Sequence, residues 1–231
     1  MDKMETLDEI GLRCGTDKAS NRHGYLNFYD MMLRDLREKP VKLLEIGIYK
    51  GASLQMWSDY FANGTITGAD VRAGIETLET DRIKPVHADQ NNIIQLTELC
   101  MTRGPFDVIV DDGSHRWDHQ MTSLVTLLPF VKPGGYYILE DLHTSDAASA
   151  EGYRGLATIS PVEYLADLSK RLCLTRSVGK ANTEADRFLR AFMMDLEFIC
   201  WHTSTVVMRR KEIRAKATAP TSAEEPPVAA E

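Results

Sequence analysis

The sequence predicts an α/β fold in which a mostly parallel, seven-stranded sheet carries helices on both faces and ends in an antiparallel hairpin. From Val41 onward, short β-rich runs alternate with longer helical patterns, which is typical of βαβ units. Residues 196–210 then form two adjacent strand-like runs with a turn around residues 202–204. The length of 231 residues, 43% of them hydrophobic, provides the core of one globular domain.

The first five strands and the helices between them follow from hydrophobic periodicity. The predicted strands are residues 41–46, 64–70, 83–88, 106–111 and 136–140. Apolar residues at three- and four-residue spacing predict the intervening helices at residues 53–62, 92–102 and 117–131. Pro133, Gly134 and Gly135 predict a break before the fifth strand.

The ends of the chain differ from this repeating pattern. Helices are predicted at residues 160–173 and 185–194, before the terminal hairpin. From Ala215 the chain lacks periodic apolar residues, and we expect disorder there. The expected organisation is therefore an N-terminal helical lid over residues 1–40, a main domain over residues 41–211 and a disordered tail over residues 212–231.

Composition restricts the class of partner. The net charge of −7 leaves no general basic excess for phosphates, so a nucleic-acid substrate is disfavoured and a small molecule is favoured. The four cysteines contain no CxxC pair, which argues against a disulfide framework and a structural zinc site. The N-terminus is charged where a signal peptide would be apolar, and no run is long enough to span a membrane. We expect a cytoplasmic homo-oligomer.

The loop after the first strand indicates the kind of cofactor. It reads LLEIGIYKGAS over residues 43–53 and leads into a helix whose N-terminus can hold a ligand. Dinucleotide sites need G-x-G-x-x-G, but Tyr49 stands where the second glycine would be. Glu45 can pair with an ammonium group, whereas it would repel phosphate. With Gly47 and Ser53, these residues favour S-adenosylmethionine.

Polar residues at three further strand ends are candidate cofactor contacts. Asp70 ends the second strand, where an acidic residue can accept both ribose hydroxyls. Asp89 and Gln90 follow the third strand and could hydrogen-bond the adenine edge. Asp111, at the end of the fourth strand, is added to this set. Singly, each could be a loop cap or a solvated charge; at successive strand ends they favour a cofactor site.

Four carboxylates follow the fourth and fifth strands, namely Asp111, Asp112, Glu140 and Asp141. Neighbouring strands lie about 4.8 Å apart, so these groups must share either a proton or a cation. Capping of helix N-termini is the alternative, but it contributes only about 1 kcal/mol per residue and does not need four carboxylates. We expect Mg²⁺ at Asp112 and Asp141, with Glu140 as a third or more distant residue.

These residues, together with the terminal hairpin, resemble a class I S-adenosylmethionine-dependent methyltransferase, whose fold is Rossmann-like. Against the catechol O-methyltransferase type, residues 43–53 match the cofactor loop, and Asp112 and Asp141 match two metal aspartates. The asparagine that is the third metal ligand in that type falls on Leu142 here.

A closer resemblance is to the macrolide and aromatic-polyketide sugar O-methyltransferases of antibiotic biosynthesis. Three segments carry it: GTDK at residues 15–18 with His23 and Tyr25, DDGSH at residues 111–115, and EDLHTS at residues 140–145. The resemblance implies bound magnesium, a histidine base, and a sugar hydroxyl of a glycosylated natural product or nucleotide sugar as the methyl acceptor.

His115 is the predicted general base, acting beside Asp112. It lies at the start of a helix, where the dipole disfavours the protonated form. His143 is a rival base or a substrate contact at the same mouth. His119 lies four residues after His115, but the segment lacks the glutamate of HExxH, so we interpret His119 as solvated or outside the metal shell.

Two segments outside the strand ends are also candidates. Lys18 and Tyr25 could fold over the cofactor as part of a lid that excludes water. For Tyr25 and Tyr29, four residues apart, ordinary helix packing explains the spacing equally well. The long polar stretch of residues 144–158 is the kind of loop that carries substrate contacts, and Tyr153 and Arg154 are the candidates in it.

Three other functions stay open at this stage. One is catechol-type methylation of a dihydroxyaromatic molecule. Another is a nicotinamide-dependent oxidoreductase, against which Tyr49 argues. The third is a non-catalytic S-adenosylmethionine-binding partner subunit, since a fold does not fix a function.

Overall fold

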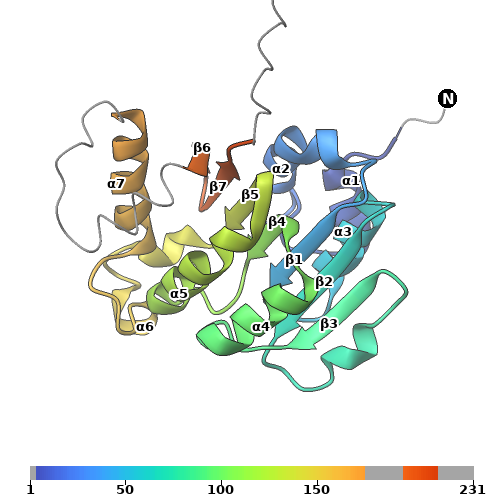
Figure 1. Ribbon diagram of the computed structural model, residues 1–231, viewed down its shortest axis with the longest axis horizontal. Helices are drawn as coiled ribbons and strands as arrows, with labels where there is room; N and C mark the ends of the chain where they lie inside the picture. Colours follow the sequence, from blue (N-terminus) through green and yellow to red (C-terminus); the bar gives the residue numbers. More distant parts are fainter. Residues whose placement is uncertain (1–3, 175–194, 213–231) are drawn as a thin grey trace, which may run out of the picture.

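The computed structural model describes residues 4–174 and 195–212. They form a seven-stranded sheet in the order β3-β2-β1-β4-β5-β7-β6, with helices on both sides of it (Figure 1). β1 to β5 are parallel, and β7 pairs antiparallel with both β5 and β6. The predicted fold class is confirmed, including the terminal hairpin.

The register of the central strands brings their carboxyl ends to one edge. The strands are β1 Lys42–Ile46, β2 Thr65–Asp70, β3 Ile83–His87, β4 Phe106–Asp111, β5 Val131–Leu139, β6 Leu196–His202 and β7 Thr205–Arg210. Ile46 pairs with Asp111, and Asp111 pairs with Leu139. The residues that follow these three strands therefore emerge side by side.

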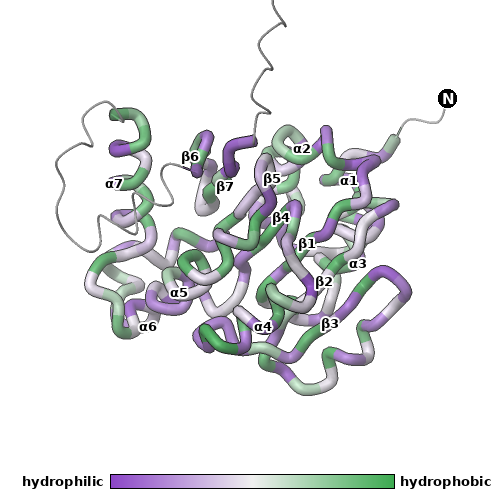
Figure 2. Tube along the Cα trace, in the orientation of Figure 1, coloured by the Kyte–Doolittle hydropathy of each residue, from purple (hydrophilic) through white to green (hydrophobic). Residues whose placement is uncertain are grey.

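Alternation along the strands divides the core between the two faces. Leu43 and Leu44 point to opposite faces of β1 and lie in different clusters of buried side chains. The helices are α1 Leu7–Cys14, α2 Leu26–Leu33, α3 Ala52–Tyr60, α4 Ile93–Arg103, α5 Trp117–Leu127, α6 Ala150–Tyr153 and α7 Pro161–Cys173. The cluster with Leu43 contains residues of α1, α2 and α3, whereas that with Leu44 contains residues of α4, α5 and α7. Along α7, hydrophobic and hydrophilic residues alternate, as expected of a helix with one face on the core (Figure 2).

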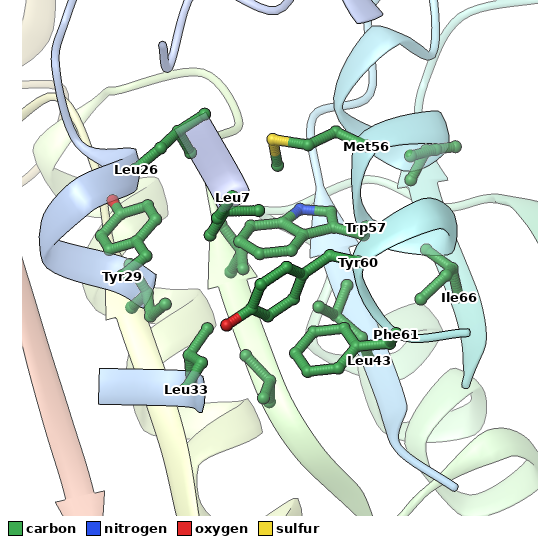
Figure 3. Close-up of a cluster of buried hydrophobic side chains, with 14 of the residues drawn as sticks. Leu7, Leu26, Tyr29, Leu33, Leu43, Met56, Trp57, Tyr60, Phe61 and Ile66 are labelled. Carbon is green, nitrogen blue, oxygen red and sulfur yellow. The ribbon is translucent and has the colours of Figure 1, made fainter. Parts of the chain in front are cut away.

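The N-terminal segment contains α1 and α2 and packs into the core, while its role as a lid stays a prediction. Leu7 of α1, with Leu26 and Tyr29 of α2, lies beside Trp57 and Tyr60 of α3 (Figure 3). Thr6 and Glu9 form a capping box at the start of α1. The loop between α1 and α2 is therefore held at both ends by buried helices, which fixes its position over the sheet.

Some predicted boundaries were wrong. The fifth strand begins at Val131 and includes Pro133, Gly134 and Gly135, because a register shift between Phe106 and Val108 accommodates the irregular backbone. The preceding helix ends at Leu127 and continues as a 3₁₀ turn, η3 Leu128–Phe130. The helix expected at residues 185–194 and the tail from residue 213 lie outside the described residues.

Three further 3₁₀ turns complete the elements: η1 Arg34–Leu36, η2 Ile75–Leu78 and η4 Leu142–Ser145. Across the described part of the chain, none of the helices combines the length and the apolar character that a bilayer crossing requires.

Candidate active site

A cavity of about 1150 Å³ opens at the carboxyl ends of the strands. It is bordered by the loop of residues 15–22, the turn after β1, the ends of β2 and β3, residues 112–115 and Asp141. Ligand cavities usually measure about 300–1,000 Å³, so this one has room for more than one small molecule. Its place at the sheet edge is the one expected for a parallel α/β fold.

The turn after β1 is shaped by positive φ angles and by Asp70. Gly47 has φ 81° and Tyr49 has φ 43°. A Cβ atom on Gly47 would overlap the backbone carbonyl of Asp112, so only glycine allows these two loops to approach so closely. One oxygen of Asp70 accepts the backbone N–H groups of Ile48 (3.0 Å) and Tyr49 (3.2 Å). Asp70 thus fixes the turn. It also lines the cavity, where its remaining lone pairs can accept hydrogen bonds from a ligand.

The rim of this turn carries a cationic group that the sequence did not indicate as functional. Tyr49 is 63% exposed, and the guanidinium of Arg72 lies 4.6 Å from the centre of its ring. Both side chains line the cavity. Arg72 lies two residues after Asp70 in the sequence, and this proximity to a predicted site residue could have identified it as part of the site.

Asp111 was predicted to contact the cofactor, but it is fully buried and is not among the described residues that line the cavity. It accepts hydrogen bonds from Gln90 Nε2 (2.6 Å), Tyr137 Oη (3.0 Å) and Ser123 Oγ. Gln90 in turn accepts the backbone N–H of Ser114 at 2.8 Å. Burial raises the pKa of Asp111 to about 7. Asp111 therefore holds Gln90, which does line the cavity.

Glu45 was predicted to face a cofactor ammonium group, and it faces a lysine instead. It is fully buried, accepts the hydroxyl of Ser53 at 2.7 Å, and has Oε1 3.4 Å from Lys18 Nζ. The period of two along β1 puts Glu45 on the same face as Leu43, and α1 and α2 cover that face. Glu45 is absent from the described cavity lining for this reason.

Lys18 lies at the centre of a buried ionic cluster. Its side chain is 1% exposed, and its Nζ contacts Asp112 Oδ2 and lies 2.6 Å from Glu140 Oε2. Burial alone would lower the pKa of Lys18, but Asp112, Glu140 and Glu45 hold it well above its ordinary value. Burial raises the pKa of each of these carboxyl groups, and Lys18 opposes the rise. One ammonium thus faces three carboxylates.

Beside this cluster, Asp112, His115 and Asp141 form a group that could hold a metal ion. One ligand atom from each lies within 4.8 Å of the others. The Nδ1 atom of His115 is buried, makes no hydrogen bond to any described residue, and lies 3.5 Å from Asp141 Oδ2. His115 and Asp141 both have positive φ angles, 58° and 55°, which are strained for residues other than glycine. Two carboxylates and an unpartnered imidazole nitrogen fit a divalent cation.

Two of the three predicted metal residues are therefore brought together, and the third is not. Glu140 is 1% exposed and is held by Lys18 and by Tyr29 Oη at 3.0 Å, outside this group. His115, predicted as a base, occupies the place beside Asp112 and Asp141 instead. The Leu142 side chain is apolar and buried, so it offers no ligand atom.

The predicted substrate residues lie outside the described cavity lining. His143 is exposed, with Nδ1 3.8 Å from Asp141 Oδ1. Tyr153 is exposed, and the guanidinium of Arg154 lies 5.6 Å from the Trp117 ring. Their contact with an acceptor stays a prediction.

Other residues line the cavity without having been assigned to it. His119, interpreted as solvated or outside the metal shell, lines the cavity and has Nδ1 2.8 Å from Ser114 Oγ. Asn21 and Arg22 also line it, from the loop that contains Lys18. The GTDK motif just before them was the signal that could have extended the site in this direction.

The chain is similar to proteins that are named as methyltransferases. Residues 44–142 match a family model described as a methyltransferase domain. Demethylmacrocin O-methyltransferase of Streptomyces fradiae is 37% identical over 193 residues, which cover 78% of this chain and 49% of that protein. Mycinamicin VI 2''-O-methyltransferase of Micromonospora griseorubida is 38% identical over 148 residues, 60% of this chain and 36% of that protein. The chain thus spans half the length, or less, of these relatives.

A solved structure shows the same arrangement of elements. It is the methyltransferase MycE of the mycinamycin biosynthetic pathway, in complex with Mg, SAH and mycinamycin VI. It superposes with a TM-score of 0.75 and 27% sequence identity, covering 95% of this chain and 58% of that one.

Proposed function

The chain carries a methyltransferase domain of the class I, Rossmann-like fold and resembles macrolide and polyketide sugar O-methyltransferases, and from this we propose that it methylates a sugar hydroxyl. The resemblance predicted from the sequence is confirmed. The methyl donor in the proposal is S-adenosylmethionine, the metal is Mg²⁺, and the acceptor is a glycosylated natural product or a nucleotide sugar. The observation that carries the proposal is the group of Asp112, His115 and Asp141 at the cavity of a methyltransferase domain.

The donor occupies the part of the cavity bordered by the turn after β1 and the ends of β2 and β3. Gly47 lets the backbone of the turn approach the ligand, and Asp70 keeps Ile48 and Tyr49 in place. Asp89 and Gln90 border the far end, and Gln90 is fixed by Asp111. Asp70 and Asp89 would attract a positively charged sulfonium compound and repel a pyrophosphate, while the cations of this region, Lys50 and Arg72, lie beside the Tyr49 ring at the rim.

The acceptor end needs a group to hold a hydroxyl and a group to take its proton. Asp112 and Asp141 supply the carboxylate oxygens that Mg²⁺ prefers, so they are the ligands in the proposal. When bound, the sulfonium compound supplies an activated methyl group and the metal lowers the pKa of the hydroxyl. His115 accepts the hydroxyl proton, and the Asp141 carboxylate 3.5 Å from its Nδ1 stabilises the resulting imidazolium.

The names of two relatives favour a sugar as the acceptor over a catechol. One is a 2''-O-methyltransferase of mycinamicin VI, and another is a 3'-O-methyltransferase of a rhamnosyl tetracenomycin. A cation held by the two carboxylates on adjacent strands would also suit the two oxygens of a catechol. The experiment below therefore compares sugars with catechols as acceptors.

The test measures S-adenosylhomocysteine formation by the full chain across a panel of deoxysugar glycosides and catechols, with Mg²⁺ and with EDTA. We expect turnover of glycosides that EDTA abolishes and that Asp112→Asn or His115→Gln lowers by about 10²-fold or more. Asp89→Asn is the matched control on the donor side and should mainly raise KM for the donor. Turnover that persists in EDTA would refute the metal, and turnover of catechols alone would refute the sugar.

A further inference from the structure

Each of the two carboxylates in the Asp112, His115 and Asp141 group has one oxygen held by the N-terminal segment, residues 4–33. Lys18 Nζ contacts Asp112 Oδ2. Tyr25 Oη donates a hydrogen bond of 3.0 Å to Asp141 Oδ1. These partners are 94 and 116 residues apart in the sequence. The N-terminal segment lies outside residues 44–142, which match the methyltransferase domain.

We propose that Tyr25 is a positioning residue of the cation site: its hydroxyl fixes the Asp141 carboxylate so that the other oxygen, Oδ2, faces Asp112 and His115. The inference rests on the proposed function, because it assumes that Asp141 binds a divalent cation. Tyr25 itself is not a ligand in this arrangement. It acts through the orientation of Asp141.

The surroundings of Tyr25 give its hydroxyl one direction. The residue is 1% exposed, its ring stacks on His23 at 5.2 Å, and the ring of Tyr29 lies at 5.9 Å. A buried ring with two aromatic neighbours has little freedom to turn. The phenol hydroxyl carries a proton that it can donate, and the Asp141 oxygen that it meets at 3.0 Å is an acceptor.

Asp141 needs such a partner because its own backbone does not fix the side chain. Its φ of 55° places it in the left-handed region at the start of η4, where its side chain makes no capping hydrogen bond. The Oδ2 atom lies 3.5 Å from His115 Nδ1. Without Tyr25, rotation about the Cα–Cβ and Cβ–Cγ bonds of Asp141 would move this oxygen away from Asp112, the other ligand, and from His115 Nδ1.

Tyr29, in the first turn of α2, provides a comparison with Tyr25, the residue that caps this helix. Its hydroxyl also meets a carboxylate beyond the end of β5, since Tyr29 Oη lies 3.0 Å from Glu140 Oε1. It is equally buried. Glu140, however, is held by Lys18 and lies outside the group that could bind a metal. Tyr29 Oη also lies 2.9 Å from Thr205 Oγ1, so removal of its hydroxyl should cost the fold at least as much as removal of that of Tyr25. Cation binding, in contrast, should depend on Tyr25 alone.

The experiment measures Mn²⁺ affinity of the full chain by titration calorimetry and by electron paramagnetic resonance of free Mn²⁺, with and without S-adenosylhomocysteine. Partners that orient metal ligands usually contribute 10- to 100-fold in affinity. We expect Tyr25→Phe to raise the Kd for Mn²⁺ about 10-fold, and Tyr29→Phe to change it less than about 2-fold. The Tm without metal and the affinity for S-adenosylhomocysteine are measured for both variants.

The outcomes separate this inference from the function on which it rests. If the wild-type protein takes up no Mn²⁺, the metal in the proposed function is wrong, and the role of Tyr25 falls with it. If the wild type binds Mn²⁺ and Tyr25→Phe binds it equally well, only the role of Tyr25 is wrong. Equal losses in both variants, or a loss that follows the change in Tm, would show a general packing effect and would also overturn the inference.

Discussion

The donor side and the cation side of the cavity are held in place by different kinds of contact. On the donor side, Asp70 accepts two backbone N–H groups from residues 21 and 22 positions away in the sequence. On the cation side, Lys18 and Tyr25 reach carboxylates 94 to 122 positions away. The donor side is thus shaped by the turns of the sheet itself, and the cation side by a separate helical segment packed onto it.

The two sides also differ in how charge is compensated. Asp70 is a single carboxylate paired with neutral backbone donors. Lys18 faces Asp112, Glu140 and Glu45 together; it is buried with the two glutamates, and the Asp112 side chain is 21% exposed at the cavity. Loss of one partner on the donor side removes hydrogen bonds, whereas loss of Lys18 leaves several charges unpaired in a region that excludes water.

The largest expected effect comes from removal of that ammonium. Lys18→Met should lower the free energy of unfolding by about 3–5 kcal/mol, the usual result of breaking a buried ion pair on one side. Asp70→Asn, the comparison on the donor side, should cost about 1–3 kcal/mol because it weakens hydrogen bonds to a charged acceptor. Urea unfolding of the metal-free proteins measures both. If the lysine variant cost no more than the aspartate variant, the contrast between the two sides would be wrong.

On the donor side, the close approach of two backbones should be the sensitive point. Gly47→Ala places a Cβ against the Asp112 carbonyl in a backbone conformation with φ 81°. The strain of that conformation and the overlap together should cost about 2–4 kcal/mol. Affinity for S-adenosylhomocysteine should fall as well, as measured by calorimetry. Gly74→Ala, at φ 86° with open space around its Cα, is the control and should cost only the conformational part.

The donor side could be predicted largely from the sequence because it follows from strand ends. Asp70 and Gln90 were placed at the cavity by that rule alone. The errors concern direction: Asp111 and Asp112 are adjacent and therefore point to opposite faces, and only Asp112 reaches the cavity. The same alternation, applied to Glu45, would have turned it toward the face of Leu43.

The cation side could be predicted only in part. Asp112 and Asp141 come together because β4 and β5 are neighbours, and that was foreseen. The partner of Glu140 depends on how the loop between α1 and α2 packs over the sheet, which no local pattern in the sequence specifies. Lys18 and Tyr25 were predicted to cover the cofactor, which stays a prediction, and their contacts with the carboxylates were not foreseen.

Asp111 lies between the two sides, because it holds Gln90 on the donor side and is adjacent to Asp112 on the cation side. Its ionisation should make the stability of the protein depend on pH. Its pKa of about 7 in the folded protein lies above the ordinary value of 3.8, so the folded state binds the extra proton. Its contribution to stability is complete below about pH 4 and is lost as the pH rises through 7. Asp111→Asn removes this slope. From pH 5 to pH 7.5, the variant should gain about 2–3 kcal/mol relative to the wild type in urea unfolding.

A difference between Asp111→Asn and the wild type that does not change with pH would contradict this account, and a variant that loses stability relative to the wild type as the pH rises would reverse it. Asp107→Asn, at the half-buried start of the same strand, controls for charge removal from β4. Its carboxylate pairs with Lys132 at the opposite end of the sheet, far from the cavity. Its effect on stability should not change between pH 5 and pH 7.5 in the way predicted for Asp111→Asn.

The smallest expected effect on stability tests whether the cation side is arranged for binding at the expense of folding. Asp141→Asn removes a negative charge that raises the pKa of Asp112, and asparagine tolerates the left-handed backbone well. The metal-free variant should therefore be more stable by about 1 kcal/mol, visible as a higher Tm without metal. Its Mn²⁺ affinity should fall at least 10-fold, because one of two carboxylate ligands is lost. If the variant were less stable than the wild type, Asp141 would stabilise the fold, through its hydrogen bond with Tyr25. Its conformation would then not be one that is strained in the absence of a cation.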